Sequence, residues 1–178
     1  MKPHDYRDLI ASYVDANYAA KGISVYTEVQ LGKTIIGKNR LLDVFVLRRS
    51  DQVALAIECK YQQVQGTTDE KIPYALQDLD ALWVPGCLVY AGDGWSKGVL
   101  HTLEGSRGAA YCYPERPGLL RTPRTRELDH ILAAVFGLWD FVIPAERRFG
   151  REPQLLLPLR EPKKAALQTP TAIKKPAG

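Results

Sequence analysis

The spacing of apolar residues changes from helical to alternating about twenty residues into the chain. Apolar side chains recur three and four residues apart over residues 4–20, which predicts a helix with one buried face. The following part is rich in β-branched residues that alternate with polar ones, and it predicts strands over residues 23–32, 40–50 and 52–61. The polar pair Ser50-Asp51 predicts a turn that joins the last two strands into an antiparallel hairpin.

The second half of the chain alternates between helical and strand patterns. Spaced leucines predict a helical segment over residues 67–82. Pro73 lies inside this pattern, so we expect the helix proper to begin there, with Pro73 in its first turn. A buried strand, a short helix, a short strand and a last helix are then expected over residues 87–91, 95–105, 109–113 and 127–142. This order predicts an α/β (α+β) domain in which helices flank a central mixed β-sheet.

Charge separates the end of the chain from the rest. The net charge is +4, and the residues from Ala145 onward hold eight Lys or Arg against three acids, which leaves 16 basic and 17 acidic residues before them. We therefore expect a folded domain over residues 1–144 and a flexible, basic, Pro- and Lys-rich tail over residues 145–178. Such a tail suits an anionic partner, and it is equally typical of a solubilising end.

Composition favours an intracellular globular protein. No run of 18 apolar residues is present, and charges occupy the N-terminal positions where a signal peptide needs an apolar stretch, so we expect no membrane contact and a cytoplasmic location. The 46% hydrophobic content is enough for one core. Three cysteines lie far apart, without the paired spacing of zinc sites, and are expected in that core: Cys59, Cys87 and Cys112.

Isolated charges interrupt the apolar strands. Glu58 and Lys60 end the run VALAIECK and would share one face about 7 Å apart, because side chains alternate along a strand. Asp43, in LLDVFV, lies about as far from the Ser50 turn as Glu58 does, so the two should be nearly opposite. Glu28 is a further isolated acid on the first strand. Carboxylates are suitable ligands for Mg²⁺, and a nearby lysine favours phosphodiester hydrolysis as the reaction. The alternative is that Glu58 and Lys60 form only a solvated salt bridge.

These residues also resemble a known family. The order Glu28, Asp43 in RLLDVFV, AIECK, and Gln77 in a following helix resembles the PD-(D/E)XK nuclease superfamily, which has the restriction-endonuclease-like fold. The resemblance covers about residues 5–91. Leu42 stands where the motif's name has a proline. Some of the surrounding pattern is similar to uncharacterised bacterial and phage members. This resemblance implies that the protein is located in the cytoplasm of a bacterium or of a phage's host.

The resemblance implies a role for each matching residue. Asp43 would bridge the metal, Glu58 would be its second ligand, and the main-chain carbonyl of Cys59 would complete the set. Lys60 would position the attacking water or stabilise the transition state. The implied cofactor is Mg²⁺, with Mn²⁺ able to substitute. Further members of the catalytic set would be Glu28, Gln62 and Gln77.

The function implied is a metal-dependent endonuclease (deoxyribonuclease) acting on DNA. The alternatives are a catalytically silent nucleic-acid-binding module on the same fold and a structural protein with a mere surface ion pair. Cutting both strands usually requires two active sites, so a homodimer is possible. A Pro- and Gly-rich loop and the segment after residue 91 offer cations for phosphate contact, or are merely solvated: Arg116, Arg121, Arg124, Arg126 and Lys97.

Overall fold

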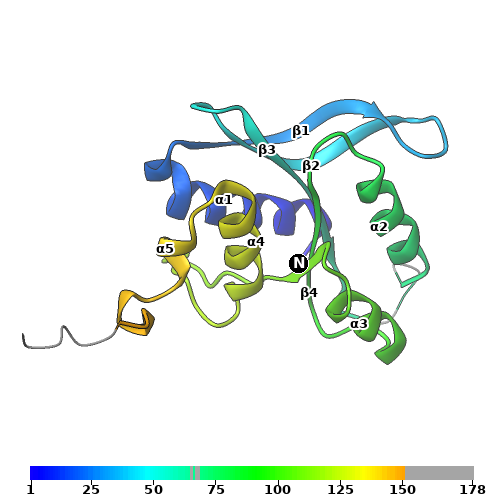
Figure 1. The fold of residues 1–178 in the computed structure, drawn as a ribbon. Coiled ribbons are helices and arrows are strands. Elements are labelled where there is room, and N and C mark those ends of the chain that lie inside the picture. Colours follow the sequence, from blue (N-terminus) through cyan, green and yellow to red (C-terminus); the bar gives the residue numbers. More distant parts are fainter. Residues whose placement is uncertain (65, 67–68, 151–178) are drawn as a thin grey trace, which may run out of the picture. The chain divides into compact units, whose positions relative to one another are not determined.

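The predicted strands form one five-stranded mixed sheet in the computed structural model (Figure 1). The structure describes residues 1–64, 66 and 69–150. Strand order follows chain order; the first three strands are antiparallel, and the last two pairings are parallel. The α/β prediction with a central mixed sheet is thereby confirmed. The strands are β1 (Ile23–Lys33), β2 (Asn39–Arg48), β3 (Val53–Tyr61), β4 (Gly86–Ala91) and β5 (Ala109–Tyr111).

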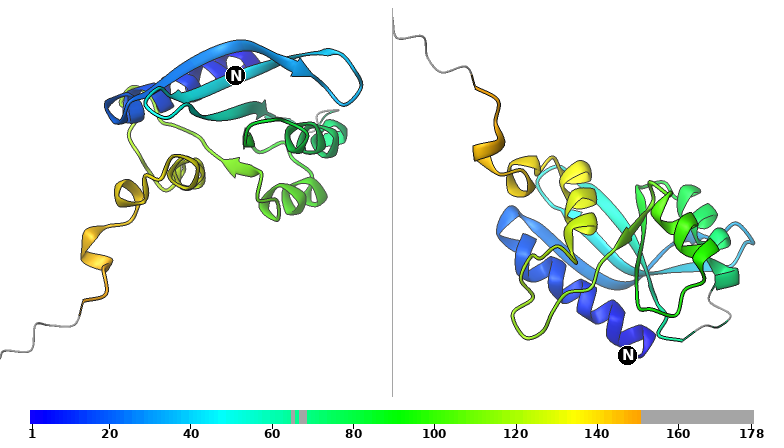
Figure 2. Two further views of the ribbon diagram at one scale, coloured as in Figure 1. Left: turned by 45° about the horizontal axis from the view of Figure 1, so that its top comes forward. Right: turned by 90° about the horizontal axis from the view of Figure 1, so that it is seen from below.

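Helices cover both faces of this sheet. Figure 2 (right) shows α1 and α4 on one side of β4 and α2 and α3 on the other. Each side has its own buried apolar cluster, so the sheet is the middle of three layers. The helices are α1 (Pro3–Tyr18), α2 (Ile72–Asp80), α3 (Lys97–Glu104), α4 (Arg126–Phe136) and α5 (Trp139–Val142), with 3₁₀ turns at Ala19–Lys21, Asp69–Lys71 and Ala145–Arg147.

The apolar stripe of α1 is buried against the sheet, as its spacing predicts. Its tyrosines also satisfy their hydroxyl groups in the core. Tyr6 donates to the carbonyl of Cys112 at 2.6 Å, and Tyr13 and Tyr18 donate to one oxygen of Asp129 at 2.5 and 2.6 Å. Buried hydroxyl groups need such acceptors, so these contacts fix α1 in position across the sheet.

The prediction of one last helix over residues 127–142 is wrong in one respect. The chain forms two helices, α4 and α5, because Gly137 adopts the left-handed conformation with φ of 65°. This conformation ends a helix, and the amide of Leu138 then bonds the carbonyl of Ala133 at 3.0 Å. Gly137 is therefore a C-terminal cap within a segment whose apolar spacing looks continuous.

The chain separates into a compact unit over Met1–Glu146 and a second unit from Arg147 onward. Most of the predicted basic tail, residues 151–178, lies outside the described residues, so its flexibility stays a prediction. All three cysteines are buried and free, as expected for core residues. Within the described ranges, no helix combines the length and hydrophobicity needed to cross a bilayer.

Candidate active site

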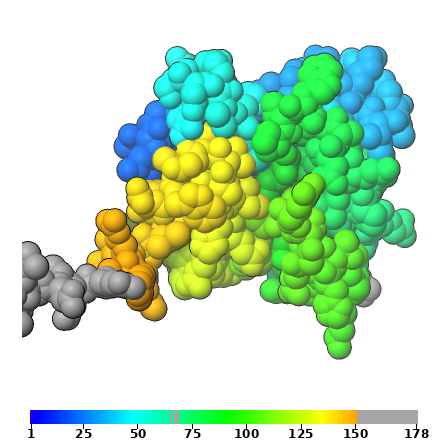
Figure 3. Space-filling model, viewed as in Figure 1, coloured from blue at the N-terminus to red at the C-terminus, as the bar shows by residue number. Residues whose placement is uncertain are grey.

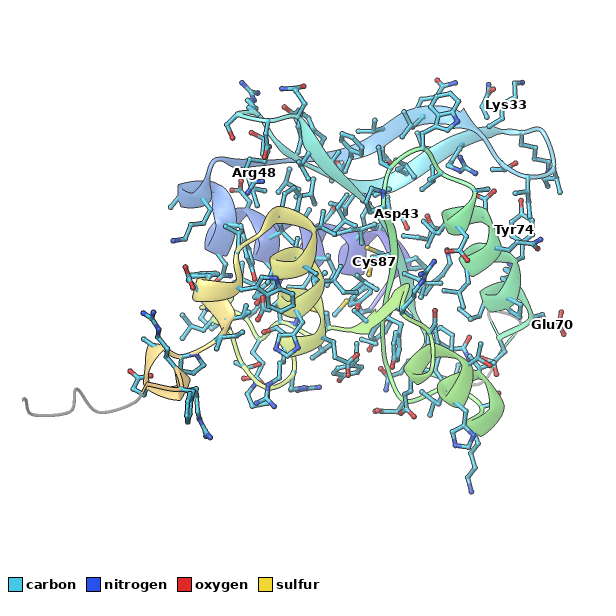
Figure 4. All side chains as sticks on the ribbon, in the orientation of Figure 1. Lys33, Asp43, Arg48, Glu70, Tyr74 and Cys87 are labelled. Atoms are coloured by element: carbon cyan, nitrogen blue, oxygen red, sulfur yellow. The ribbon has the colours of Figure 1, made fainter. Side chains whose placement is uncertain are left out.

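β2 and β3 separate after the pair Val44–Ile57. Beyond this pair, β2 continues along β1, while β3 continues along β4 from Glu58 onward. Asp43 and Glu58 are the first residues past the last pair, so they face each other where the two strands open. Figure 4 labels Asp43 there, and the predicted hairpin register accounts for this proximity.

Past the pair Val44–Ile57, the β3 main chain has no β2 backbone group to bond, and the side chain of Asp43 supplies an acceptor instead. Its Oδ2 accepts the main-chain N–H of Cys59 at 2.8 Å, and the side chain is partly buried. The N–H and C=O groups of one strand residue point to the same side, so the Cys59 carbonyl is directed toward β2 as well. The carboxylate of Asp43 is thereby oriented by the backbone beside Glu58.

Glu58 and Lys60 lie on the same face of β3 and form an ion pair between Oε1 and Nζ. Their side chains are 26% and 22% exposed. Burial raises the pKa of Glu58 above its ordinary value; the Lys60 ammonium opposes this shift, and the negative charge of Asp43 adds to it. Two acids and a lysine thus share a site with restricted access to water.

This site opens into a cavity of about 250 Å³ between the sheet and α2. Glu58 and Lys60 form part of its wall, and Lys71 and Tyr74 contribute from the helix side (Figure 4 labels Tyr74). Sequence reasoning missed Lys71 and Tyr74, because the helical pattern shows only which face is apolar. The two residues lie three positions apart at the start of α2, a spacing that places side chains on the same side of a helix.

A buried ion pair forms another wall of the cavity. The guanidinium of Arg40, at the start of β2, donates to both carboxylate oxygens of Asp78 on α2, at 2.8 and 2.9 Å, and to its carbonyl at 3.1 Å. Their side chains are 8% and 14% exposed. The bonds from Arg40 lower the pKa of Asp78. This ion pair connects α2 to the β1–β2 hairpin. The two residues are far apart in the sequence, so no local sequence pattern predicts their contact.

Glu28 is turned away from the two acids. It has a φ of 55°, rare for a residue with a side chain, and pairing between β1 and β2 skips it. Its Oε1 accepts a bond from Arg7 of α1 at 2.6 Å, and its side chain is 60% exposed. The structure therefore places Glu28 with α1 rather than in the cavity with Glu58.

The two glutamines also lie outside this cavity. Gln62 is buried, and its Nε2 donates to Asp69 and to the carbonyl of Gly94, both at 2.7 Å. It therefore connects β3 to the segments before α2 and after β4. Gln77 lies on the exposed part of α2 and does not line the cavity.

The predicted arginine loop is not part of the cavity either. Arg121 donates to the Phe141 carbonyl at 2.6 Å and stacks over that ring, so it holds α5. Arg124 stacks over Tyr113, and with Arg116 it lines a separate hollow of about 590 Å³ beside the start of α1. Arg126 borders another hollow, and Lys97 begins α3. Any nucleic-acid contact by these five cations would use surfaces away from Glu58.

The mixed sheet with helices on both faces makes this an α/β protein. The chain belongs to the PD-(D/E)XK nuclease superfamily, whose domain model matches residues 2–139. No curated protein matches the sequence significantly. The crystal structure of a protein of unknown function, AF1548, is similar with 17% identity and a TM-score of 0.41, over 72% of this chain and 78% of that one.

The raised pKa of Glu58 predicts that this residue costs stability near neutral pH. An acid whose pKa is raised by folding stabilises the fold below its unfolded pKa, about 4.3, and loses that contribution as pH rises through the folded value. We expect Glu58→Gln to increase the free energy of unfolding by about 1 kcal/mol at pH 7 and hardly at all at pH 4. Urea denaturation at both pH values measures this difference.

A matched control is Glu70→Gln, because Glu70 is exposed just before α2 (Figure 4). This variant should change the free energy of unfolding by less than about 0.5 kcal/mol at either pH. If Glu58→Gln is less stable than the wild type at pH 7, the ionised carboxylate stabilises the fold and the argument fails.

Proposed function

We propose that this protein is a Mg²⁺-dependent endonuclease that hydrolyses phosphodiester bonds in DNA. The observation that supports this most is the meeting of Asp43, Glu58 and Lys60 where β2 and β3 separate, beside an open cavity. Membership of a nuclease superfamily agrees with it. The ion pair alone would suit a structural role, and Asp43 has one in its bond to the Cys59 amide. A second acid that meets this pair beside a cavity is what favours the catalytic role.

The residues present fit a magnesium ion. In residues 1–64, 66 and 69–150, no group of three or more His, Cys, Asp or Glu side chains is arranged to hold a metal. Mg²⁺, however, is commonly held by one or two carboxylates, with waters and substrate phosphate oxygens as its other ligands. Asp43 and Glu58 would supply the carboxylates, and the Cys59 carbonyl would be the third protein ligand. When bound, the ion would lower the pKa of a water and offset negative charge on the phosphate.

The chain's own groups would position the reacting atoms. Asp43 is held by the Cys59 amide, so one of its oxygens keeps a fixed direction. Lys60 would exchange its bond to Glu58 for one to the attacking water or to a phosphate oxygen, where its positive charge stabilises the transition state. Lys71 and Tyr74, on the opposite wall, would bind the phosphate groups on either side.

Removing the metal tests this function directly. Purified protein is incubated with supercoiled plasmid, linear duplex and single-stranded DNA in Mg²⁺, Mn²⁺ or EDTA. We expect nicked and linear products with either metal, no product in EDTA, and a loss of at least 100-fold in Asp43→Asn. A linear product that depends on protein concentration would support a dimer on DNA.

Two other outcomes would contradict the proposal. Salt-sensitive binding without cleavage in any metal would identify a silent nucleic-acid-binding module. Cleavage that persists equally in EDTA and in Asp43→Asn would come from a contaminating nuclease or from another site.

A further inference from the structure

The hairpin between β1 and β2 ends in two exposed isoleucines. The hairpin tip, residues 33–39, is closed by bonds from Thr34 N to the Lys38 carbonyl and from Gly37 N to the Thr34 carbonyl, both at 2.8 Å. This turn places Ile35 and Ile36 at its centre, where they are 42% and 61% exposed. Polar residues or glycine usually occupy such positions, so two large apolar side chains there need another explanation.

The hairpin tip is bonded to α2 beside the candidate active site. Asp78 of α2, which binds Arg40, also accepts the main-chain N–H of Ile35 at 2.8 Å. Thr34 and Leu41 line the same cavity as Glu58 and Lys60. In the space-filling view, the light-blue atoms of the hairpin lie at the upper right, next to the green part of the chain (Figure 3).

The charge around the tip suits a polyanion. Residues 29–42 contain three basic residues and no acid. Arg40 is occupied by Asp78, but Lys33 and Lys38 are exposed on either side of the isoleucines (Figure 4 labels Lys33). An 86% exposed indole, that of Trp83, lies against the hairpin at Gly32, about 3.7 Å from where a Cβ of this glycine would lie. In a duplex, stacked bases lie between two rows of phosphates. The apolar side chains would match the bases, and the flanking lysines would match the phosphates.

We propose that the hairpin tip is a wedge that enters duplex DNA next to the cleaved bond. Ile35 and Ile36 insert between neighbouring base steps, and Lys33 and Lys38 bind the phosphates on either side. This inference rests on the proposed function for its substrate. Insertion costs the unstacking of a base step, a cost that is smaller where pairing is already disrupted. The protein should therefore prefer mismatched or branched duplexes to perfectly paired ones.

Binding without cleavage tests the wedge separately from catalysis. Fluorescence anisotropy in EDTA compares a 30-base-pair duplex with the same duplex carrying two adjacent mismatches, and 2-aminopurine beside the mismatch reports unstacking. We expect the wild type to bind the mismatched duplex about tenfold more tightly and to increase the 2-aminopurine fluorescence. The double variant Ile35→Thr, Ile36→Thr should lose both effects. The matched control is Ile143→Thr, because Ile143 is 53% exposed after α5.

A second variant tests the charge. Lys33→Gln with Lys38→Gln should weaken binding to both duplexes and should reduce the slope of log K against log salt by about 2, since each phosphate contact contributes about 0.9. Circular dichroism and thermal melting check that each variant is folded.

The outcomes distinguish the wedge from the nuclease. If the isoleucine variant keeps the mismatch preference and the fluorescence change, the wedge is wrong, whether or not the wild type cleaves DNA. If binding depends on the hairpin but no metal supports cleavage, the wedge stands and the nuclease function fails. If the wild type binds no duplex, both fail.

Discussion

Lys60→Ala is expected to lower the rate of metal-dependent DNA cleavage about 100- to 1,000-fold. Loss of one group that stabilises developing negative charge typically has an effect of this size. Lys60 points into the cavity from the same face as Glu58, with a side chain 22% exposed. Its pairing with Glu58 is partly exposed to water, so the free energy of unfolding should change by only about 1 kcal/mol or less.

Single-turnover cleavage at saturating protein measures this effect apart from binding. Anisotropy in EDTA should give a dissociation constant within about threefold of the wild type, because one phosphate contact contributes little to a large interface. Lys21→Ala is the matched control, since Lys21 lies over the Phe141 ring on the α1 side of the sheet. More than a tenth of the wild-type rate in Lys60→Ala would mean that this lysine has no catalytic role.

Local patterns explain why the proximity of Asp43 and Glu58 could be predicted. Strand alternation fixes the face of Glu58 and Lys60, and a short turn at Ser50-Asp51 fixes which residues are opposite. Both rules act over a few residues, and neither needs knowledge of the rest of the fold. The same rule places β2 and β3 side by side, whereas the parallel pairings of β4 and β5 follow crossovers through helices, and no turn rule gives their place in the sheet.

Long-range contacts and unusual backbone conformations explain the rest. Glu28 is a strand residue by pattern, yet its positive φ and its bond to Arg7 turn it toward α1. Gln62 follows the polar face of β3, but burial and its bond to Gly94 place it outside the cavity. These contacts join residues that are distant in the sequence, and a single sequence does not show which distant residues meet.

The ion pair of Arg40 and Asp78 should give the largest effect on stability. Arg40→Met leaves a carboxylate that is 14% exposed without its partner, and Asp78→Asn leaves a buried guanidinium. We expect each variant to lose about 3 to 5 kcal/mol of unfolding free energy at pH 7, as is typical when one member of a buried pair is removed. Urea denaturation measures the loss. Asp51→Asn, which removes the more exposed pair with Arg48, is the control with a smaller expected effect.

Acid should reduce the difference between these variants and the wild type. Folding lowers the pKa of Asp78, so its contribution is present above the unfolded pKa of about 3.9 and is lost as pH falls through the folded value. The defect of Arg40→Met should therefore be smaller at pH 3 than at pH 7. A defect that is independent of pH would show that packing, rather than charge, is what Arg40 contributes.

The double variant Arg40→Met, Asp78→Leu separates stability from the position of the hairpin. Replacing both charges by apolar groups of similar size is often nearly neutral, so it should recover most of the loss. It also removes the carboxylate that accepts the Ile35 amide, and the hairpin tip would then no longer be fixed to α2. Recovered stability with a reduced mismatch preference would show that the pair positions the hairpin, whereas recovery of both would limit the pair to a structural role.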